Sequence, residues 1–269
     1  MKLFISDYDG TYLRPKLEKE EQLRRNAVAV DEWQLEEGLF GFSTGRILPL
    51  MELELKTQVI ETDFMIVANG ALVLDSKGET IFHQVLDSEV ANEVVSYLIQ
   101  EGNLNFICSN GKDGYHTEGV VQGSSMTEVF ITLKEVGCFN MTLEEALRQG
   151  VSQFSIVDLT PEEVEPLAAK MESLFGDRLR IYPNRSSIDL SPIGISKATG
   201  IQHVLDYFNL TPDQVICMGD SWNDVEMIQK YQGLTVPEAP AVLRRAAKKI
   251  FSTVEEALKW AKKEKDYRK

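Results

Sequence analysis

The chain has little of what marks secreted, membrane-spanning or thiolate-metal proteins. Its three cysteines, Cys108, Cys138 and Cys217, are widely spaced and form no CxxC pair, which argues against a disulfide framework or a cysteine-ligated metal. No apolar run approaches the length that spans a bilayer, and Asp7 and Asp9 interrupt any secretory-signal pattern near the start. We therefore expect a cytoplasmic protein with reduced, mostly buried thiols.

Basic residues are also scarce. The 269 residues include 28 lysines and arginines against 42 aspartates and glutamates, which gives a formal net charge of −14. Nucleic acids and anionic membranes require a basic face, so neither is expected as a partner. An acidic chain that binds an anion must instead supply a local cation. The length allows one large domain or two modest ones, and the 43% hydrophobic content is that of a globular protein.

Apolar strands alternate with amphipathic helices at both ends of the chain. Strands are expected over Leu3–Ser6, Leu39–Ser43, Phe64–Ala68 and Val215–Met218, and helices over residues 20–37, 197–208, 223–230 and 241–249. Such alternation predicts right-handed βαβ units and a doubly wound parallel sheet of the α/β class. Between about residues 80 and 190, paired strands and a helix over 164–175, introduced by Thr160, Pro161 and Glu163, predict an α+β domain. The middle of the chain is thus inserted into a core made from both ends.

Two aspartates follow the first strand, in Asp7-Tyr8-Asp9-Gly10-Thr11. Side chains two apart in a strand point the same way, so Asp7 and Asp9 are expected to converge at its carboxyl end, where α/β sheets bind ligands. Two carboxylates held that close require a compensating charge, and an all-oxygen ligand set favours Mg²⁺. Aspartate and glycine are also ordinary turn residues, so this segment alone leaves a turn and a metal site equally open.

Three further polar clusters stand where strands give way to helices. Ser43-Thr44-Gly45-Arg46 can present helix N-terminal amides to a phosphate oxygen, or can simply cap a helix. Lys197 opposes the dipole of its helix unless an anion binds there; taken alone, it is better explained as a solvated surface residue. In Gly219-Asp220-Ser221-Trp222-Asn223-Asp224, Asp220 can supply a third carboxylate for a metal, whereas Asp224 can be the acidic half of a capping box.

Together these segments resemble the four ordered motifs of the haloacid dehalogenase-like phosphatases. The matching segments are Asp7-x-Asp9-Gly10-Thr11, Thr44-Gly45-Arg46, Lys197 and Gly219-Asp220-Ser221-x-Asn223-Asp224. Ala68-Asn69-Gly70-Ala71 and Gly194-Ile195-Ser196-Lys197 add a resemblance to the Cof-type sugar-phosphatase branch. The resemblance implies a Rossmann-like catalytic core over residues 1–83 and 190–269, with a C2-type α+β cap domain inserted over 84–189.

The resemblance also implies a role for each matching residue. Asp7 would be the nucleophile that forms an aspartyl-phosphate, and Asp9 would protonate the leaving alcohol and then activate water. Mg²⁺ would be held by Asp7, the Asp9 backbone carbonyl and Asp220. Asp224 would orient Lys197 or metal-bound water. The phosphate oxygens would be bound by four groups: Thr44, the Gly45 amide, Lys197 and Asn223.

These roles predict a Mg²⁺-dependent phosphoric monoester hydrolase for small phosphorylated metabolites, with sugar phosphates as the expected class. A phosphosugar mutase would need a second phosphate site in the cap, yet the cap arginines form no obvious cluster: Arg148, Arg178, Arg180 and Arg185. A non-catalytic phospho-ligand-binding module would have no need of Asp7. The loop Ser109–Gly119 is a candidate for leaving-group contact, although His116 within it can equally be an exposed loop residue. We expect a monomer or a weak homodimer.

Overall fold

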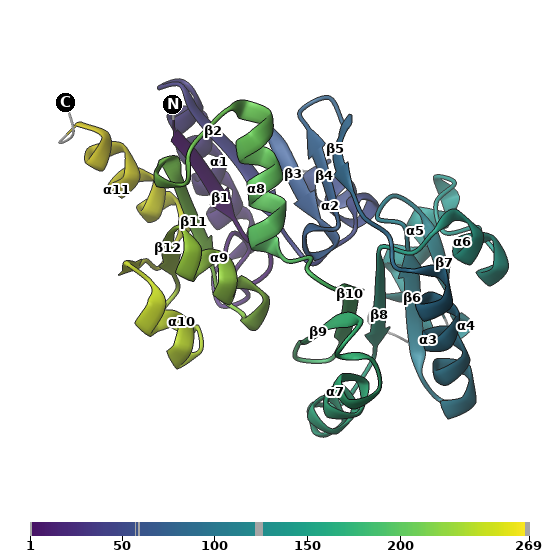
Figure 1. The fold of residues 1–269 in the computed structure, drawn as a ribbon. Helices are drawn as coiled ribbons and strands as arrows, with labels where there is room; N and C mark the ends of the chain where they lie inside the picture. Colours follow the sequence, from purple (N-terminus) through teal and green to yellow (C-terminus); the bar gives the residue numbers. More distant parts are fainter. Residues whose placement is uncertain (1, 57, 59, 122–125, 267–269) are drawn as a thin grey trace. The chain divides into compact units, whose positions relative to one another are not determined.

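The computed structural model describes residues 2–56, 58, 60–121 and 126–266 (Figure 1). Contacts group the chain into two compact units, the first formed by Met1–Thr44, Leu53–Phe82 and Ser196–Lys269, and the second by Gly45–Glu52 and His83–Ile195. The expected boundary at residue 190 needs correction, because it would cut through a strand of the second unit, β10 (Ile188–Pro192). The segment Gly45–Glu52 was also expected in the core, but it belongs to the second unit.

The first unit is built around an eight-stranded sheet in the order β13-β12-β11-β1-β2-β3-β4-β5. Its strands are β1 (Lys2–Ser6), β2 (Gly38–Ser43), β3 (Phe64–Val67), β4 (Leu72–Asp75), β5 (Thr80–His83), β11 (Val215–Gly219), β12 (Gln232–Thr235) and β13 (Lys249–Ile250). Every neighbouring pair from β13 to β3 is parallel, and β4 is antiparallel to β3. The central strands are apolar and buried, as strands covered on both faces require. The predicted α/β class is confirmed.

Helices cover both faces of this sheet. They include α1 (Lys19–Gln34), α8 (Lys197–Phe208), α9 (Val225–Lys230), α10 (Ala241–Ala246) and α11 (Val254–Asp266). The chain passes from β1 to β2 through α1 and from β11 to β12 through α9, in opposite directions across the sheet, so right-handed crossovers place α1 and α9 on opposite faces. Helix α8 packs with α9, and α11 packs with α1. The order reverses between β1 and β11, the switch point where open α/β sheets bind ligands.

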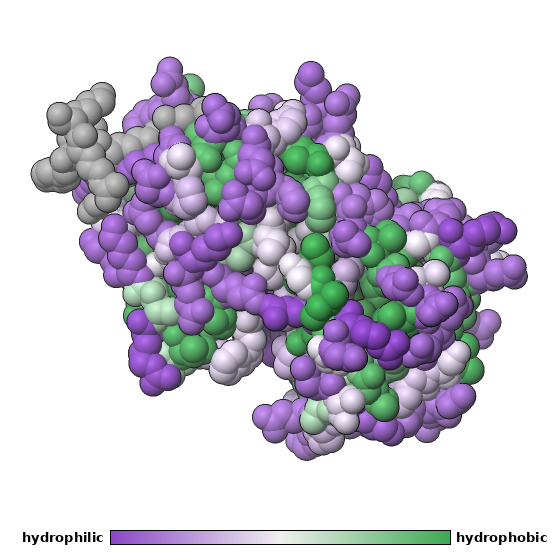
Figure 2. Space-filling view, viewed as in Figure 1, coloured by the Kyte–Doolittle hydropathy of each residue, from purple (hydrophilic) through white to green (hydrophobic). Residues whose placement is uncertain are grey.

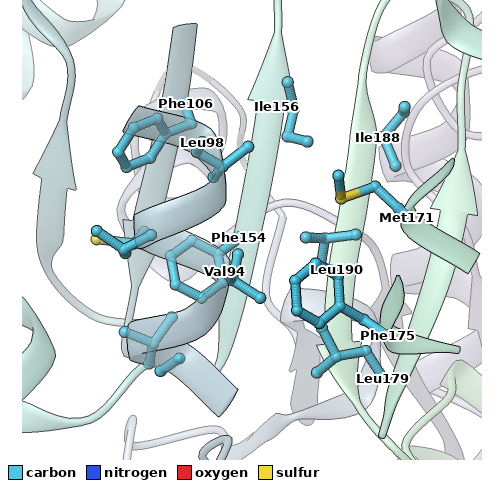
Figure 3. Close-up of a cluster of buried hydrophobic side chains, with 14 of the residues drawn as sticks. Val94, Leu98, Phe106, Phe154, Ile156, Met171, Phe175, Leu179, Ile188 and Leu190 are labelled. Atoms are coloured by element: carbon cyan, nitrogen blue, oxygen red, sulfur yellow. The ribbon is translucent and has the colours of Figure 1, made fainter. Parts of the chain in front are cut away.

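The second unit contains a five-stranded antiparallel sheet in the order β7-β6-β8-β10-β9. Its other strands are β6 (Asn105–Ser109), β7 (Gly114–His116), β8 (Gln153–Val157) and β9 (Leu179–Pro183), and its helices are α3 (Ser88–Glu101), α4 (Glu118–Val121), α5 (Thr127–Glu135), α6 (Leu143–Gln149) and α7 (Pro161–Phe175). Figure 3 shows side chains from α3 and α7 packed against alternate residues of the sheet, among them Phe154, Ile156 and Leu190. This is the predicted α+β architecture.

Two of the expected helices have the expected ends, and two end earlier than expected. Helix α7 begins at Pro161 behind a capping box of Thr160 and Glu163, and α8 covers 197–208, so both predictions are confirmed. The helix expected over 241–249 ends at Ala246, because Lys249 pairs with β12 as part of β13. The helix expected over 20–37 ends at Gln34, and Glu37 has a positive φ of 60° before β2.

The visible surface is mainly hydrophilic, and two of the three cysteines are buried. Hydrophilic residues cover most of the face visible in Figure 2, with apolar residues dispersed among them. Within the described residues, no helix has the length and apolarity needed to cross a membrane. Cys108 and Cys217 are buried, and Cys138 is half-buried.

Candidate active site

The candidate site stands on the carboxyl ends of two adjacent parallel strands, β1 and β11. The register pairs Ser6 with Met218, and the backbone N–H of Asp7 donates to the Met218 carbonyl at 2.8 Å. Asp7 therefore extends the pairing of the strands by one residue. Asp220 follows β11 directly. The two aspartates consequently emerge at the same edge of the sheet, at its switch point.

The turn after Asp7 depends on Gly10. Its φ of +81° lies in the left-handed region, and a Cβ at this position would lie 2.2 Å from Oδ2 of Asp220. Asp220 also accepts a hydrogen bond of 2.8 Å from the hydroxyl of Thr11. The Asp220 carboxylate therefore packs directly against the turn. Only glycine can adopt this φ without strain and also leave room for the Asp220 side chain.

Asp9 has a different setting from Asp7. Strand β1 ends at Ser6, and the chain then turns, with the Gly10 N–H donating to the Leu13 carbonyl at 2.9 Å. The strand-alternation argument does not reach Asp9, because β1 ends before it, so the convergence of the two carboxylates stays a prediction. Asp7 is buried, whereas Asp9 is exposed in the turn. The role of the Asp9 backbone carbonyl as a metal ligand stays a prediction.

Lys197 is a buried cation and not a solvated surface lysine. Its Nζ lies 2.7 Å from Oδ1 of Asp7 and 2.6 Å from Oδ1 of Asp224, and the residue is only 1% exposed. Burial by itself would lower the pKa of the Lys197 ammonium, but the two carboxylates outweigh it and raise this pKa. Lys197 therefore stays charged at neutral pH and supplies the local cation that an acidic chain needs to bind an anion.

Asp224 holds Lys197 and the loop after β11 at the same time. Its Oδ1 accepts from Lys197, and its Oδ2 accepts from the backbone N–H groups of Asp220 and Ser221, both at 2.9 Å. The capping box with Ser221 is present as well as the contact to Lys197, so both interpretations of Asp224 are correct. Because both oxygens are engaged, Asp224 is better placed to support Lys197 than to ligate a metal.

Three carboxylates gather around this single lysine. Oxygens of Asp7, Asp220 and Asp224 lie within 4.8 Å of one another. Burial raises the pKa of the Asp7 carboxyl, Lys197 opposes the shift, and the charges of Asp224 and Asp220 add to it, so this pKa is well above its usual range. Burial and the charge of Asp224 also raise the pKa of Asp220. An excess of negative charge with oxygen donors is a setting that a divalent cation relieves, so these residues fit Mg²⁺.

Asn69 contacts two of the residues expected to bind phosphate, Thr44 and Asn223, and was itself assigned no role from the sequence. The Asn69 N–H donates to the carbonyl of the buried Thr44 at 3.0 Å, and Gly45 begins the second unit. The Asn223 amide donates to Oδ1 of Asn69 at 2.8 Å and accepts from the Ser221 hydroxyl at 2.6 Å. An Asn-Gly pair directly after a buried strand was the signal that marked this position.

One of the two alternatives for His116, in the second unit, is contradicted by the structure. His116 is buried and is not an exposed loop residue, because its ring packs edge-on to Phe130 at 5.0 Å and its Nδ1 donates to the Thr117 carbonyl. Arg178, one of the arginines weighed for a second phosphate site, pairs with Glu93 at 2.8 Å. His116 therefore contributes to packing.

The chain is similar to known proteins over most of its length. A family model of haloacid dehalogenase-like hydrolases matches residues 4–257. The chain is 27% identical over 259 residues to the 5-amino-6-(5-phospho-D-ribitylamino)uracil phosphatase YcsE of Bacillus subtilis, covering 94% of this chain and 90% of that one. It is 24% identical over 242 residues to the chloroplastic endoribonuclease YBEY of Arabidopsis thaliana, which is 83% of this chain but spans only 39% of that relative.

Solved structures agree in fold. A HAD/COF-like hydrolase from Plasmodium vivax superimposes with a TM-score of 0.78 at 24% identity, covering 96% of this chain and 94% of that one. The HAD subclass IIB sugar phosphatase BT4131 gives a TM-score of 0.73 at 20% identity, covering 96% and 95%. At these identities the likeness establishes the fold. With the family model extending over nearly the whole sequence, the chain belongs to the haloacid dehalogenase-like hydrolases.

Proposed function

We propose that the chain is a Mg²⁺-dependent phosphatase that hydrolyses small phosphorylated metabolites through an aspartyl-phosphate intermediate. The observation that carries this proposal is the contact of 2.7 Å between the Asp7 carboxylate and the Lys197 ammonium at the switch point of the sheet. A carboxylate can attack phosphorus, and a fixed cation beside it can bind the phosphate under attack. The family assignment and the relatives named as phosphatases support the same chemistry.

The magnesium ion would be held at the acidic end of this site. Asp7 and Asp220 would contribute side-chain oxygens, and the backbone carbonyl of Asp9 would be a further ligand. When bound, the ion would offset repulsion between the nucleophile and the phosphate. Asp224 stands outside this ligand set because Lys197 and two backbone amides already engage its oxygens.

In the first step, an Asp7 carboxylate oxygen attacks the phosphorus, and the bond from phosphorus to the leaving alcohol breaks. Asp9 donates a proton to the alcohol oxygen as that bond breaks. An exposed position suits this acid, because the leaving group must reach it from solvent. The phosphate oxygens would be bound by four groups: Thr44, the Gly45 amide, Lys197 and Asn223.

In the second step, water attacks the phosphorus of the aspartyl-phosphate. Asp9, now ionised, accepts the proton of this water. The bond from phosphorus to Asp7 breaks, inorganic phosphate leaves, and the Asp7 carboxylate is restored. While Asp7 carries the phosphate, Lys197 keeps the Asp224 carboxylate, which favours its charged form by raising its pKa.

Sugar phosphates and related phosphorylated polyols are the proposed substrates. YcsE and BT4131 carry names that specify a phosphoribityl compound and a sugar phosphate, which are both phosphate monoesters of polyhydroxylated groups. A panel of such monoesters, with release of inorganic phosphate as the readout, tests this class. Consumption of a sugar phosphate without phosphate release would indicate a phosphosugar mutase instead.

The mechanism is tested with an aryl phosphate. The wild-type chain should hydrolyse p-nitrophenyl phosphate with added Mg²⁺, EDTA should abolish turnover, and Asp7→Asn should abolish it without loss of fold. Asp213→Asn is the matched control, because Asp213 lies at the opposite, amino end of β11. Turnover by Asp7→Asn at the wild-type rate would remove Asp7 as the nucleophile.

A further inference from the structure

Segments proposed to bind phosphate meet at one short turn, Ala68–Gly70, directly after β3. Ala68 and Asn69 have φ values of 50° and 54°, in the left-handed region that residues other than glycine rarely occupy. All three residues of the turn are buried. Backbone of this kind persists only where the surrounding structure determines it, and it concentrates at functional sites. The contacts of this turn show what it holds.

The first contact leads to Thr44 at the end of β2. The backbone N–H of Asn69 donates to the Thr44 carbonyl at 3.0 Å, and the Thr44 N–H donates to the Ile66 carbonyl of β3 at 2.9 Å. Both backbone polar groups of Thr44 are therefore fixed by β3 and the turn that follows it. The left-handed conformation of Asn69 is what points its N–H back toward β2.

The second contact leads to Asn223 after β11. Oδ1 of Asn69 accepts a hydrogen bond of 2.8 Å from Nδ2 of Asn223, while Oδ1 of Asn223 accepts from the Ser221 hydroxyl at 2.6 Å. Bonds at both ends of an amide fix its plane and prevent a flip of its oxygen and nitrogen. One N–H of Asn223 then points to Asn69, and no residue that the structure describes accepts from the other, which can donate to a phosphate oxygen.

The third contact leads to the start of α8, which carries Lys197. A Cβ at Gly70 would lie 2.2 Å from the backbone oxygen of Ser196, the N-cap residue of α8. The turn therefore packs directly against the start of this helix. Gly70 has a φ of +104°, and a larger residue would have to displace the helix. The turn therefore touches the segments that carry Thr44, Asn223 and Lys197.

We propose that Asn69 is a positioning residue for phosphate binding, which acts by holding the Asn223 amide in the orientation that donates to the phosphate. Asn69 does not itself contact the phosphate. This inference rests on the proposed phosphatase function. Without the Asn69 oxygen, the Asn223 amide loses one of the two bonds that fix it, so phosphate binding weakens while the attack by Asp7 is left intact.

The test separates the side chain of Asn69 from its backbone. Asn69→Gly keeps the left-handed conformation and removes the side chain, including the oxygen that accepts from Asn223. Asn209→Gly is the matched control, because Asn209 is also left-handed, with φ of 52°, and ends α8 away from the site. Both variants are assayed for KM and kcat on p-nitrophenyl phosphate, for inhibition by inorganic phosphate, and for thermal stabilisation by inorganic phosphate.

For Asn69→Gly we expect the KM and the inhibition constant of phosphate to rise about tenfold, since a hydrogen bond at a buried group is lost, with kcat changed less than about threefold. Asn209→Gly should match the wild type in both constants. In an Asn223→Ala background, Asn69→Gly should have almost no further effect on KM, because the group on which it acts is already gone.

Other results would overturn the inference. If the effects of Asn69→Gly and Asn223→Ala on KM multiplied in the double variant, Asn69 would act by a route other than Asn223. If Asn69→Gly left KM and the inhibition constant of phosphate unchanged, Asn69 would not position the Asn223 amide. If the wild type hydrolysed no phosphate monoester, the proposed function would fail. The thermal shift with inorganic phosphate would then still decide the role of Asn69, since its loss in Asn69→Gly requires no catalysis.

Discussion

Lys197 and Asp224 form an ion pair of 2.6 Å between Nζ and Oδ1, and neither side chain is more than 1% exposed. Two buried charges of this kind depend on each other: without Lys197 the Asp224 carboxylate loses its cation, and without Asp224 the Lys197 ammonium keeps only Asp7 as a carboxylate partner. Asp224 also accepts from two backbone N–H groups of the loop that carries Asp220. The pair therefore joins the cation of the site to the loop after β11.

Asp224→Ala should lower the free energy of unfolding by about 3–5 kcal/mol, because it breaks a buried ion pair and takes the acceptor from two backbone N–H groups. Asp224→Asn should cost less, because the amide keeps an acceptor for the loop. Urea unfolding measures both. Glu101→Ala is the control, since it breaks the exposed pair with Lys170 and should cost far less. Equal losses for Asp224→Ala and Glu101→Ala would contradict the structural role of Asp224.

Gly10→Ala should be destabilising for two separable reasons. The φ of +81° disfavours any residue with a Cβ, and the added carbon would press on the Asp220 carboxylate. Gly78 provides the control, because its φ is +78° and a Cβ there would meet nothing within 4 Å. Gly78→Ala should show only the backbone cost, on the order of 1 kcal/mol. Gly10→Ala should lose more free energy of unfolding than Gly78→Ala, as measured with urea, and should also weaken Mg²⁺ binding. Equal losses of free energy in the two variants would mean that Asp220 simply moves aside.

Mg²⁺ should raise the melting temperature of the wild-type chain. Binding to the folded state alone contributes about 2.7 kcal/mol when the free ion is at a hundred times its dissociation constant. Asp220→Asn should abolish most of this shift, and Asp213→Asn should leave it unchanged. Metal ligands must be ionised, and burial holds the pKa values of Asp7 and Asp220 above their usual range, so the shift should shrink as the pH falls. A shift that survives Asp220→Asn would place the ion elsewhere.

His116 should make the second unit sensitive to acid. Burial lowers the pKa of its ring below the ordinary 6.5, and the charge of Lys134 adds to this shift, although the Thr117 carbonyl opposes it. The unfolded chain therefore binds a proton more readily than the folded one, so stability is complete above pH 6.5 and falls as the pH drops from 6.5 toward the lowered folded pKa. His116→Phe should flatten this part of the stability–pH curve in urea unfolding. An unchanged curve would exclude His116 as the source.

The sheet of the first unit could be predicted because its central strands are apolar runs that alternate with capped helices. Helix α8 was also predictable, since Ser196 caps it and the apolar spacing is regular. Strand β13 was not predictable, because Lys249 and Ile250 are both exposed and only pairing with β12 defines the strand.

The composition of the site could be predicted more fully than its geometry. The burial of Lys197 was not predictable from its neighbours in the sequence, because the two carboxylates that stabilise its charge lie 190 and 27 residues away. The exposure of Asp9 follows from where β1 ends, which local apolarity does not define. Asn69 was visible only as a turn residue, because its hydrogen bond to Asn223 joins positions 154 residues apart.

The position of β1 in the middle of the sheet has a consequence for synthesis. One edge of this apolar strand pairs with β11, and Thr11 reaches its partner Asp220 across 209 residues of chain. While the ribosome makes the intervening segments, that edge has no β11 to pair with, and unpaired apolar edges are where chains associate wrongly. The closing of so long a loop also makes this pairing a late event in folding. The nascent chain therefore depends on protection of this strand edge until the segment that forms β11 has been translated.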